Sequence, residues 1–168
     1  MKNLPKIHVG MRIWKTVIAV FLCAVCGIIF NIHPFYSMIA AILCMQTNTE
    51  ESVKKGVIRS VGTFIGGLAA LAVLFLIDST PLEPFSFLYY VIISFCIAPV
   101  IYFTVLINRE SSAFISCVVF LSIVLSHIDD GNAYLFAFQR MAETIAGIVI
   151  SIAVNFFIKN HDKKTDKS

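Results

Sequence analysis

Apolar residues fill six stretches of this chain, and short groups of charged and turn-forming residues separate them. The stretches cover about residues 13–32, 35–47, 57–77, 85–107, 111–127 and 134–158. A helix that crosses the hydrocarbon core of a bilayer, which is roughly 30 Å thick, needs about 17–25 residues. Four stretches are long enough, and the second and fifth are marginal. The pattern predicts an all-α protein with six transmembrane helices.

The apolar runs are continuous and do not alternate with polar residues. VIAVFLCAVCGIIF (17–30) and GGLAALAVLFLI (66–77) are examples. The strands of a transmembrane barrel alternate between polar and apolar residues over segments of about ten residues, so a barrel is excluded. Hydrophobic residues make up 58% of the chain and charged residues 14%, against roughly 45–50% and 25% in soluble domains. The chain is therefore an integral membrane protein.

The positions of Lys and Arg predict the orientation in the membrane. If the N-terminus is cytoplasmic and all six helices cross, twelve of the 13 Lys and Arg residues fall on the cytoplasmic side. Arg140 is the exception. Cytoplasmic loops carry an excess of Lys and Arg in membrane proteins. We therefore expect both termini to be cytoplasmic.

An Arg-x-x-x-Thr-x-x-Gly pattern occurs twice, as RSVGTFIG at 59–66 and as RMAETIAG at 140–147. An ungapped alignment of 59–77 with 140–158 gives seven identities in nineteen positions. The order of long, short and long apolar stretches also occurs twice. These observations predict that the chain contains two copies of a three-helix unit.

Three crossings per unit place the second copy in the opposite orientation, as in many transporters. We expect one transmembrane domain over 1–168, with repeat one at about 13–77 and repeat two at about 85–158, and no soluble C-terminal domain. In folds of this kind, short segments at corresponding positions point to the substrate site. The stretches 35–47 and 111–127 correspond in this way.

Two charged residues, Arg140 and Glu143, lie inside the sixth stretch. A charge inside the membrane is costly, so it faces a partner or a watery cavity and marks a functional site by default. The alternative is an ion pair between these two residues, three positions apart at the membrane interface. For Arg59 the alternative is an anchor at the membrane surface, beside Lys54 and Lys55.

Small residues are expected to serve helix packing. Gly62, Gly66 and Gly67 line one part of the third stretch and Gly147 lies in the sixth. Lipid tails are as apolar as the side chains, so transmembrane helices associate by close packing of small residues. Pro99 removes a backbone hydrogen bond and is expected to kink the fourth helix.

The residues that usually carry metal or cofactor chemistry are absent as motifs. Cys23-x-x-Cys26 has no second pair to complete a metal site, and the five cysteines lie in apolar stretches as small hydrophobes. There is no ATP-binding motif, no His-Glu-x-x-His and no paired catalytic acids. We expect no enzyme activity, no cofactor, no metal and no nucleic-acid partner.

The run MQTNTEESVKKGVIRSVGTFIGG, residues 45–67, resembles the loop and third helix of the aromatic acid exporter family of bacterial membrane proteins, within the fusaric acid resistance protein superfamily. The matching positions are Met45, Gln46, Ser52, Gly56, Arg59, Gly62, Thr63, Gly66 and Gly67. Residues 10–23 and 140–158 are similar to the first and sixth helices of that family. The resemblance covers essentially the whole chain, although Thr47 stands where members often have proline.

The resemblance implies export of aromatic or related carboxylates across the bacterial inner membrane. Arginine suits this function because its planar fork of donors matches a carboxylate, and each repeat supplies one. Neutral hydrogen bonds to the substrate are expected from Gln46, Thr63, Asn108 and Thr144, and Glu143 is a candidate proton carrier.

Two other functions stay open at this point: a passive anion channel in which Arg59 and Arg140 set selectivity, and a membrane scaffold or assembly subunit without transport. The expected partners are a small organic anion, the lipid bilayer and further copies of the same chain.

Overall fold

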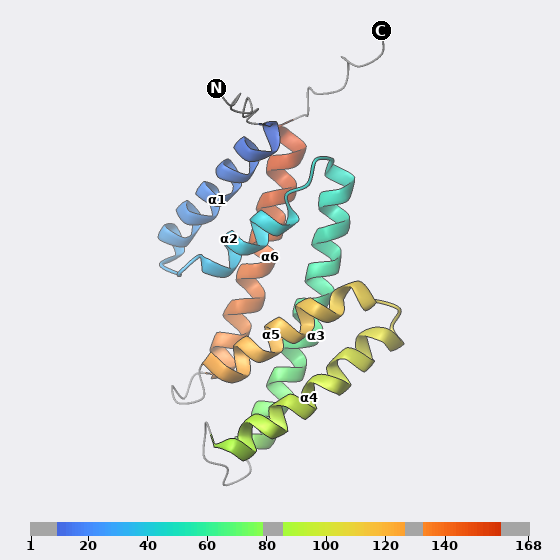
Figure 1. Ribbon diagram of the computed structural model, residues 1–168. Coiled ribbons are helices and arrows are strands. Elements are labelled where there is room, and N and C mark those ends of the chain that lie inside the picture. Colours follow the sequence, from blue (N-terminus) through green and yellow to red (C-terminus); the bar gives the residue numbers. More distant parts are fainter. Residues whose placement is uncertain (1–9, 79–85, 127–132, 159–168) are drawn as a thin grey trace, which may run out of the picture. The chain divides into compact units, whose positions relative to one another are not determined.

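The computed structural model describes residues 10–78, 86–126 and 133–158, and these form helices (Figure 1). In chain order the elements are α1 (Met11–Phe30), α2 (Phe35–Cys44), α3 (Thr49–Asp78), α4 (Phe87–Leu106), the short 3-10 helix η1 (Glu110–Ser112), α5 (Ala113–Ser126) and α6 (Ala133–Phe157). The described residues contain no strand. The predicted all-α class and the six predicted helices are confirmed.

Helix length separates four of the helices from the other two. Spans of 20, 29, 20 and 24 residues in α1, α3, α4 and α6 are long and apolar enough to cross a membrane. By contrast, α2 has 10 residues and α5 has 14, which correspond to about 15 and 21 Å of helix. The prediction of six transmembrane helices is thus supported by length for four, and α2 and α5 are short apolar helices.

The beginning of the third helix differs from the prediction. Hydropathy places its start near residue 57, but α3 starts at Thr49. Its first two turns are polar and therefore invisible to a search for apolar runs. Glu50 and Glu51 lie in the first turn, where negative charge stabilises the positive end of the helix dipole.

The chain forms two compact units. Unit 1 contains residues 1–55 and 146–168, and unit 2 contains residues 56–145. The division does not follow the predicted repeats, because α3 and α6 each continue from one unit into the other. The terminal residues and the connections 79–85 and 127–132 lie outside the described residues, so the predicted orientation stays a prediction.

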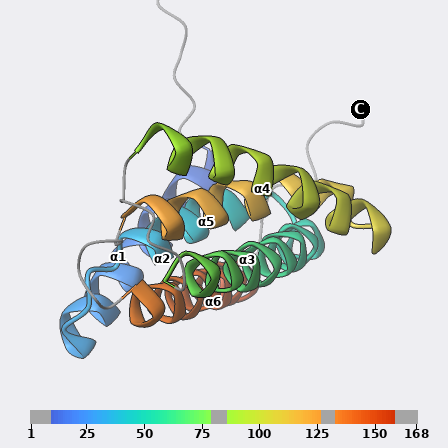
Figure 2. The ribbon, with the colours of Figure 1, turned by 90° about the horizontal axis from the view of Figure 1, so that it is seen from below.

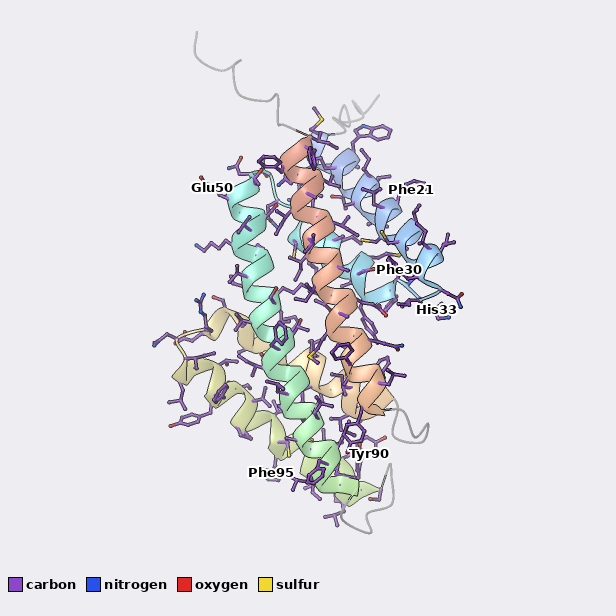
Figure 3. The ribbon with its side chains drawn as sticks, turned by 180° about the vertical axis from the view of Figure 1, so that it is seen from behind. Phe21, Phe30, His33, Glu50, Tyr90 and Phe95 are labelled. Carbon is purple, nitrogen blue, oxygen red and sulfur yellow. The ribbon has the colours of Figure 1, made fainter. Side chains whose placement is uncertain are left out.

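Unit 1 is built around the hairpin of α1 and α2 (Figure 1). Its core consists of buried residues of α1, the end of α2 and α6: Ala19, Cys23, Ala41, Met45 and Val154. The hairpin is tight, because a Cβ atom on Gly27 would lie 2.7 Å from the ring of Pro34. The large side chains on the other side of α1 are exposed, as Phe21 illustrates (Figure 3), which suits a helix that faces lipid.

Unit 2 has the larger core. Here α4 packs against α5, and α5 lies between α4 and α3 (Figure 2). The core consists of Ala70, Leu74, Tyr89, Ile93, Val100, Val119, Phe120, Ile123, Val124 and Ala137. The buried hydroxyl of Tyr89 donates a hydrogen bond to the Val124 carbonyl at 2.9 Å. That carbonyl lies in the last turn of α5, where a helix leaves its carbonyls without backbone partners.

The first helix of each predicted repeat ends in the same way. Asn31 after α1 and Asn108 after α4 adopt left-handed backbone conformations, with φ of 52° and 54°. In both, the next amide reaches back to a carbonyl five residues earlier: Ile32 to Gly27 at 2.9 Å and Arg109 to Thr104 at 2.8 Å. This is the Schellman ending, in which asparagine replaces the more usual glycine.

Candidate functional site

The first copy of the pattern and residues 140–145 of the second copy lie in unit 2, where α3 and α6 pack together. A Cβ atom on Gly67 of α3 would lie 2.6 Å from the sulfur of Met141 in α6. The two helices run in opposite directions there (Figure 1). Thr63 precedes Gly67 by four residues. Because α6 runs in the opposite direction, the residues at the level of Thr63 follow Met141 by three or four and are Thr144 and Ile145. The register therefore places Thr63 at the level of Thr144, its counterpart in the repeat.

The other side of α3 packs on α5. A Cβ atom on Gly62 would lie 2.8 Å from the Ile115 side chain and 2.9 Å from the Ser112 carbonyl. A Cβ atom on Gly66 would collide with the backbone carbonyl of Ser116. These two glycines permit a backbone-to-backbone approach that any larger residue would prevent.

Unit 1 contains an equivalent helix crossing. A Cβ atom on Gly147 of α6 would collide with the backbone carbonyl of Ser37 in α2. Gly147 occupies the position that corresponds to Gly66 in the sequence repeat, eighty-one residues later. In each unit, therefore, the repeated glycine packs on a serine carbonyl of a short helix.

The two threonine hydroxyls of the pattern differ in their hydrogen bonding. Thr144 is 3% exposed, and its hydroxyl donates to the Arg140 carbonyl at 2.9 Å. Thr63 is fully buried, and its hydroxyl oxygen has no hydrogen-bond partner among the described residues. A buried hydroxyl without a partner is rare and points to a missing water or ligand.

The charged residues of the pattern flank the threonines. Arg140 is 6% exposed, whereas Arg59 and Glu143 are half-buried. Each arginine precedes its threonine by four residues on helices that run in opposite directions, so the arginines lie about 12 Å apart along the helices, at a rise of about 1.5 Å per residue. Each arginine thus lies about one helical turn from its threonine, on opposite sides of the threonines along the helix axes.

The start of α5 lies close to Arg59 along α3. The hydroxyl of Ser112, the last residue of η1, donates to the carbonyl of Ile58 at 2.9 Å. This hydrogen bond holds the first turns of η1 and α5 beside the residue that precedes Arg59. A helix N-terminus carries a partial positive charge, so it adds to the positive potential that Arg59 creates.

Gln46 and Asn108 are the two remaining residues predicted to bind the substrate through neutral hydrogen bonds. Gln46 belongs to unit 1, where its side-chain amide donates to the Leu43 carbonyl at 3.3 Å. Asn108 is exposed and ends α4 in the left-handed conformation described above. The structure does not bring Asn108 to the buried threonines, and its assignment to substrate binding stays a prediction.

A polar cluster in unit 1 was missed by the sequence reasoning. The Lys15 ammonium donates to the Asn155 side-chain oxygen at 2.8 Å, and the Asn155 amide donates to the Ser52 hydroxyl at 2.7 Å and to the Gln46 carbonyl at 3.0 Å. The place of Lys15 near the start of an apolar stretch predicts a charge at the membrane surface, but the Lys15 side chain is only 1% exposed. The sequence feature that could have indicated this cluster is Asn155, a polar residue near the end of an apolar helix.

Metal ligands are not grouped in the part of the chain that the structure describes, where no three His, Cys, Asp or Glu side chains could hold an ion. The five cysteines lie in these helices as free thiols. The chemistry available at the α3–α6 crossing is therefore that of guanidinium, hydroxyl and carboxyl groups.

Four helices that are long and apolar enough to cross a membrane identify this chain as a multi-pass membrane protein. Residues 17–154 match the family described as fusaric acid resistance protein-like, and the chain belongs to this family. The family resemblance seen in the sequence is confirmed.

Relatives from bacteria match most of the chain. UPF0421 proteins of Bacillus cereus, Staphylococcus saprophyticus and Halalkalibacterium halodurans are 33%, 28% and 27% identical and cover 89%, 93% and 89% of it. The matched regions make up 40%, 44% and 39% of these relatives, so the chain spans about two fifths of their length. No solved structure matches the chain.

Proposed function

We propose that the chain forms a transport path for organic anions in the bacterial cell membrane and exports aromatic or related carboxylates. The observation that carries this proposal is the fully buried Thr63 hydroxyl, which has no hydrogen-bond partner among the described residues. It lies at the crossing of α3 and α6, with an arginine on either side of it. A carboxylate oxygen placed there would accept the hydrogen bond and meet positive charge.

Arginine is suited to this task because its guanidinium group keeps its charge and binds a carboxylate through two parallel hydrogen bonds. Arg140 provides the buried group, and Arg59 acts together with the N-terminus of α5. Glu143 follows Arg140 by three residues and is the proposed proton carrier. A proton gradient would then drive the export of the anion.

An inverted repeat supports an alternating path. We infer the inverted repeat from three features. The sequence pattern is repeated, and long, short and long helices follow one another twice. Gly66 and Gly147 each pack on a serine carbonyl of a short helix. The short helices α2 and α5 correspond to the discontinuous helices that form substrate sites in transporters with inverted repeats. In this proposal both termini are cytoplasmic, and the chain works as a homo-oligomer.

Flux measurement tests the proposed function. Purified protein is reconstituted into proteoliposomes that contain radiolabelled benzoate, and release is followed with and without an imposed proton gradient. We expect release that depends on the protein and is accelerated at least about tenfold by the gradient. Release that depends on the protein but not on the proton gradient would identify a passive anion channel. No release from well-folded protein, with benzoate and other aromatic carboxylates alike, would favour a scaffold.

Thr63→Val separates a binding role of the hydroxyl from a structural one. Valine has the shape of threonine without the hydroxyl, so we expect the folded protein to become more stable by about 1 kcal/mol, because an unsatisfied buried polar group is removed. Benzoate flux should fall severalfold. Thr144→Val is the matched stability control, since its hydroxyl already has an acceptor and its removal should not stabilise the protein. Unchanged flux in Thr63→Val would contradict the proposed contact.

A further inference from the structure

The strongest unassigned feature of the molecule is the buried Lys15 of unit 1. Its ammonium group has three N–H donors, and its one hydrogen bond within the described residues goes to the neutral oxygen of Asn155 at 2.8 Å. Burying a charge without a counter-charge is costly, and natural proteins rarely retain it without a function. Lys15 therefore needs an anionic partner to be stable as an ammonium ion.

The groups around Lys15 are donors more than acceptors. The Asn155 oxygen is taken by Lys15, and the two Asn155 amide hydrogens go to the Ser52 hydroxyl and the Gln46 carbonyl. The Ser52 hydroxyl oxygen accepts hydrogen bonds from the Asn155 side chain and from the backbone N–H of Gln46, the latter at 3.0 Å. Its own hydrogen and two hydrogens of Lys15 remain without an acceptor among the described residues. Two or three unused donors that include a positive charge are suited to an oxyanion, because charge-assisted hydrogen bonds are strong.

Carboxylates of unit 1 do not fill this role among the residues described. Glu50 and Glu51, in the first turn of α3, are both exposed. Figure 3 shows Glu50 on the side of α3 that faces away from α6, which carries Asn155. Within the part of unit 1 that the structure describes, the acidic residues therefore leave the ammonium group of Lys15 to another anion.

The cluster is close to the ends of three helices. Lys15 is the fifth residue of α1, Ser52 is the fourth residue of α3, and Asn155 is the third residue from the end of α6. These ends gather at one end of unit 1 (Figure 1). In membrane-spanning helices such ends lie near the headgroup region. An anion thus reaches the cluster from the water–membrane interface, about one helical turn away.

We infer that Lys15, Asn155 and Ser52 form a binding site for an oxyanion at the membrane interface. Lys15 supplies the charge and two hydrogen bonds, Ser52 supplies a third hydrogen bond, and Asn155 holds both in position. The oxyanion is the carboxylate of a solute or the phosphate of an anionic lipid. The first source deepens the proposed transport function, because it adds a second binding site for the carboxylate, and the second does not depend on that function.

Binding is measured on the full chain in nanodiscs, where no flux is needed. One arm titrates benzoate by calorimetry in nanodiscs of phosphatidylcholine. The other arm measures the thermal stability in nanodiscs with increasing phosphatidylglycerol and no benzoate. We expect one arm to give saturable binding or stabilisation, and Lys15→Met to weaken it at least about tenfold, since hydrogen bonds to charged groups are strong.

Matched variants keep the result interpretable. Lys54→Met removes an exposed lysine of α3 and should leave the affinity within about twofold of wild type. Lys15→Met should also raise the melting temperature without any oxyanion, because a buried charge is removed. Ser52→Ala keeps that charge and should weaken binding severalfold, which tests the site even if Lys15→Met fails to fold.

The site is refuted if neither arm binds, or if Lys15→Met and Ser52→Ala bind like wild type. Binding of benzoate through Lys15 by protein that shows no flux would refute the transport function and leave the site intact. Benzoate flux by protein that shows no binding through Lys15 would refute the site and leave the transport function intact.

Discussion

Replacing Arg140 with glutamine is expected to abolish benzoate flux in proteoliposomes. Glutamine removes the charge and the two-pronged donor but keeps polar character and much of the length. Arg140 is 6% exposed, in a site where charge interactions are screened far less than in water. The loss of one buried charge-assisted contact costs about 2–5 kcal/mol, which corresponds to a flux reduced roughly thirtyfold or more. Membrane insertion and thermal stability should stay near wild type.

Two further variants distinguish an anion path from an internal ion pair. Arg140→Lys keeps the charge without the planar fork and should restore only part of the flux. If Arg140 instead serves to balance Glu143, Arg140→Gln will lower the melting temperature, and adding Glu143→Gln will restore it. Wild-type flux in folded Arg140→Gln protein would reject the anion-path role. Arg59→Gln, in a half-buried position, should reduce flux less.

Replacing Gly66 with leucine is expected to prevent folding of unit 2. The added side chain would have to occupy the space of the Ser116 backbone, and a backbone cannot move aside as a flexible side chain can. Even Gly66→Ala should lower the free energy of unfolding by about 1–3 kcal/mol, the usual cost of overpacking. Gly147→Ala should behave alike, because its Cβ would meet the Ser37 backbone. Denaturation titrations of detergent-solubilised protein measure these losses.

Gly10 provides the control, because a Cβ atom there would meet nothing within 4 Å. Gly10 is the N-cap of α1, where alanine is less favourable than glycine, so Gly10→Ala should cost no more than about 1 kcal/mol. If Gly66→Ala and Gly147→Ala were as harmless as Gly10→Ala, the two close crossings would not exist in the folded protein.

The number and type of the helices could be predicted from the sequence because they depend on local composition. Six apolar runs gave the six helices, although only four of the runs are long enough to cross a membrane. The glycines were visible because small residues recur at helical spacing in Gly62, Gly66 and Gly67. The first turns of α3 were missed because glutamate and lysine form helices as readily as apolar residues do, although they add nothing to hydropathy.

The polar cluster of unit 1 could not be predicted, because it joins residues that are far apart in the chain. Lys15 and Asn155 are 140 positions apart, and no periodicity connects them. A lysine near the start of an apolar helix is usually a surface charge, so the local pattern pointed away from burial. The structural role of Asn108 depends on its own backbone. The residue ends α4 in a left-handed conformation, which the polar side chain alone does not indicate.

The hydrogen bonds that complete the two short helices also set an order for biosynthesis. The Val124 carbonyl of α5 is satisfied by Tyr89, 35 residues earlier, so its donor has already left the ribosome when α5 is made. The Gln46 carbonyl after α2 waits for Asn155, 109 residues later. The Gln46 carbonyl must therefore be hydrated or held by the insertion machinery until α6 arrives, because an unsatisfied carbonyl is not tolerated in lipid. Among the described helices, the α1–α2 hairpin is thus made before the helix that completes its hydrogen bonds.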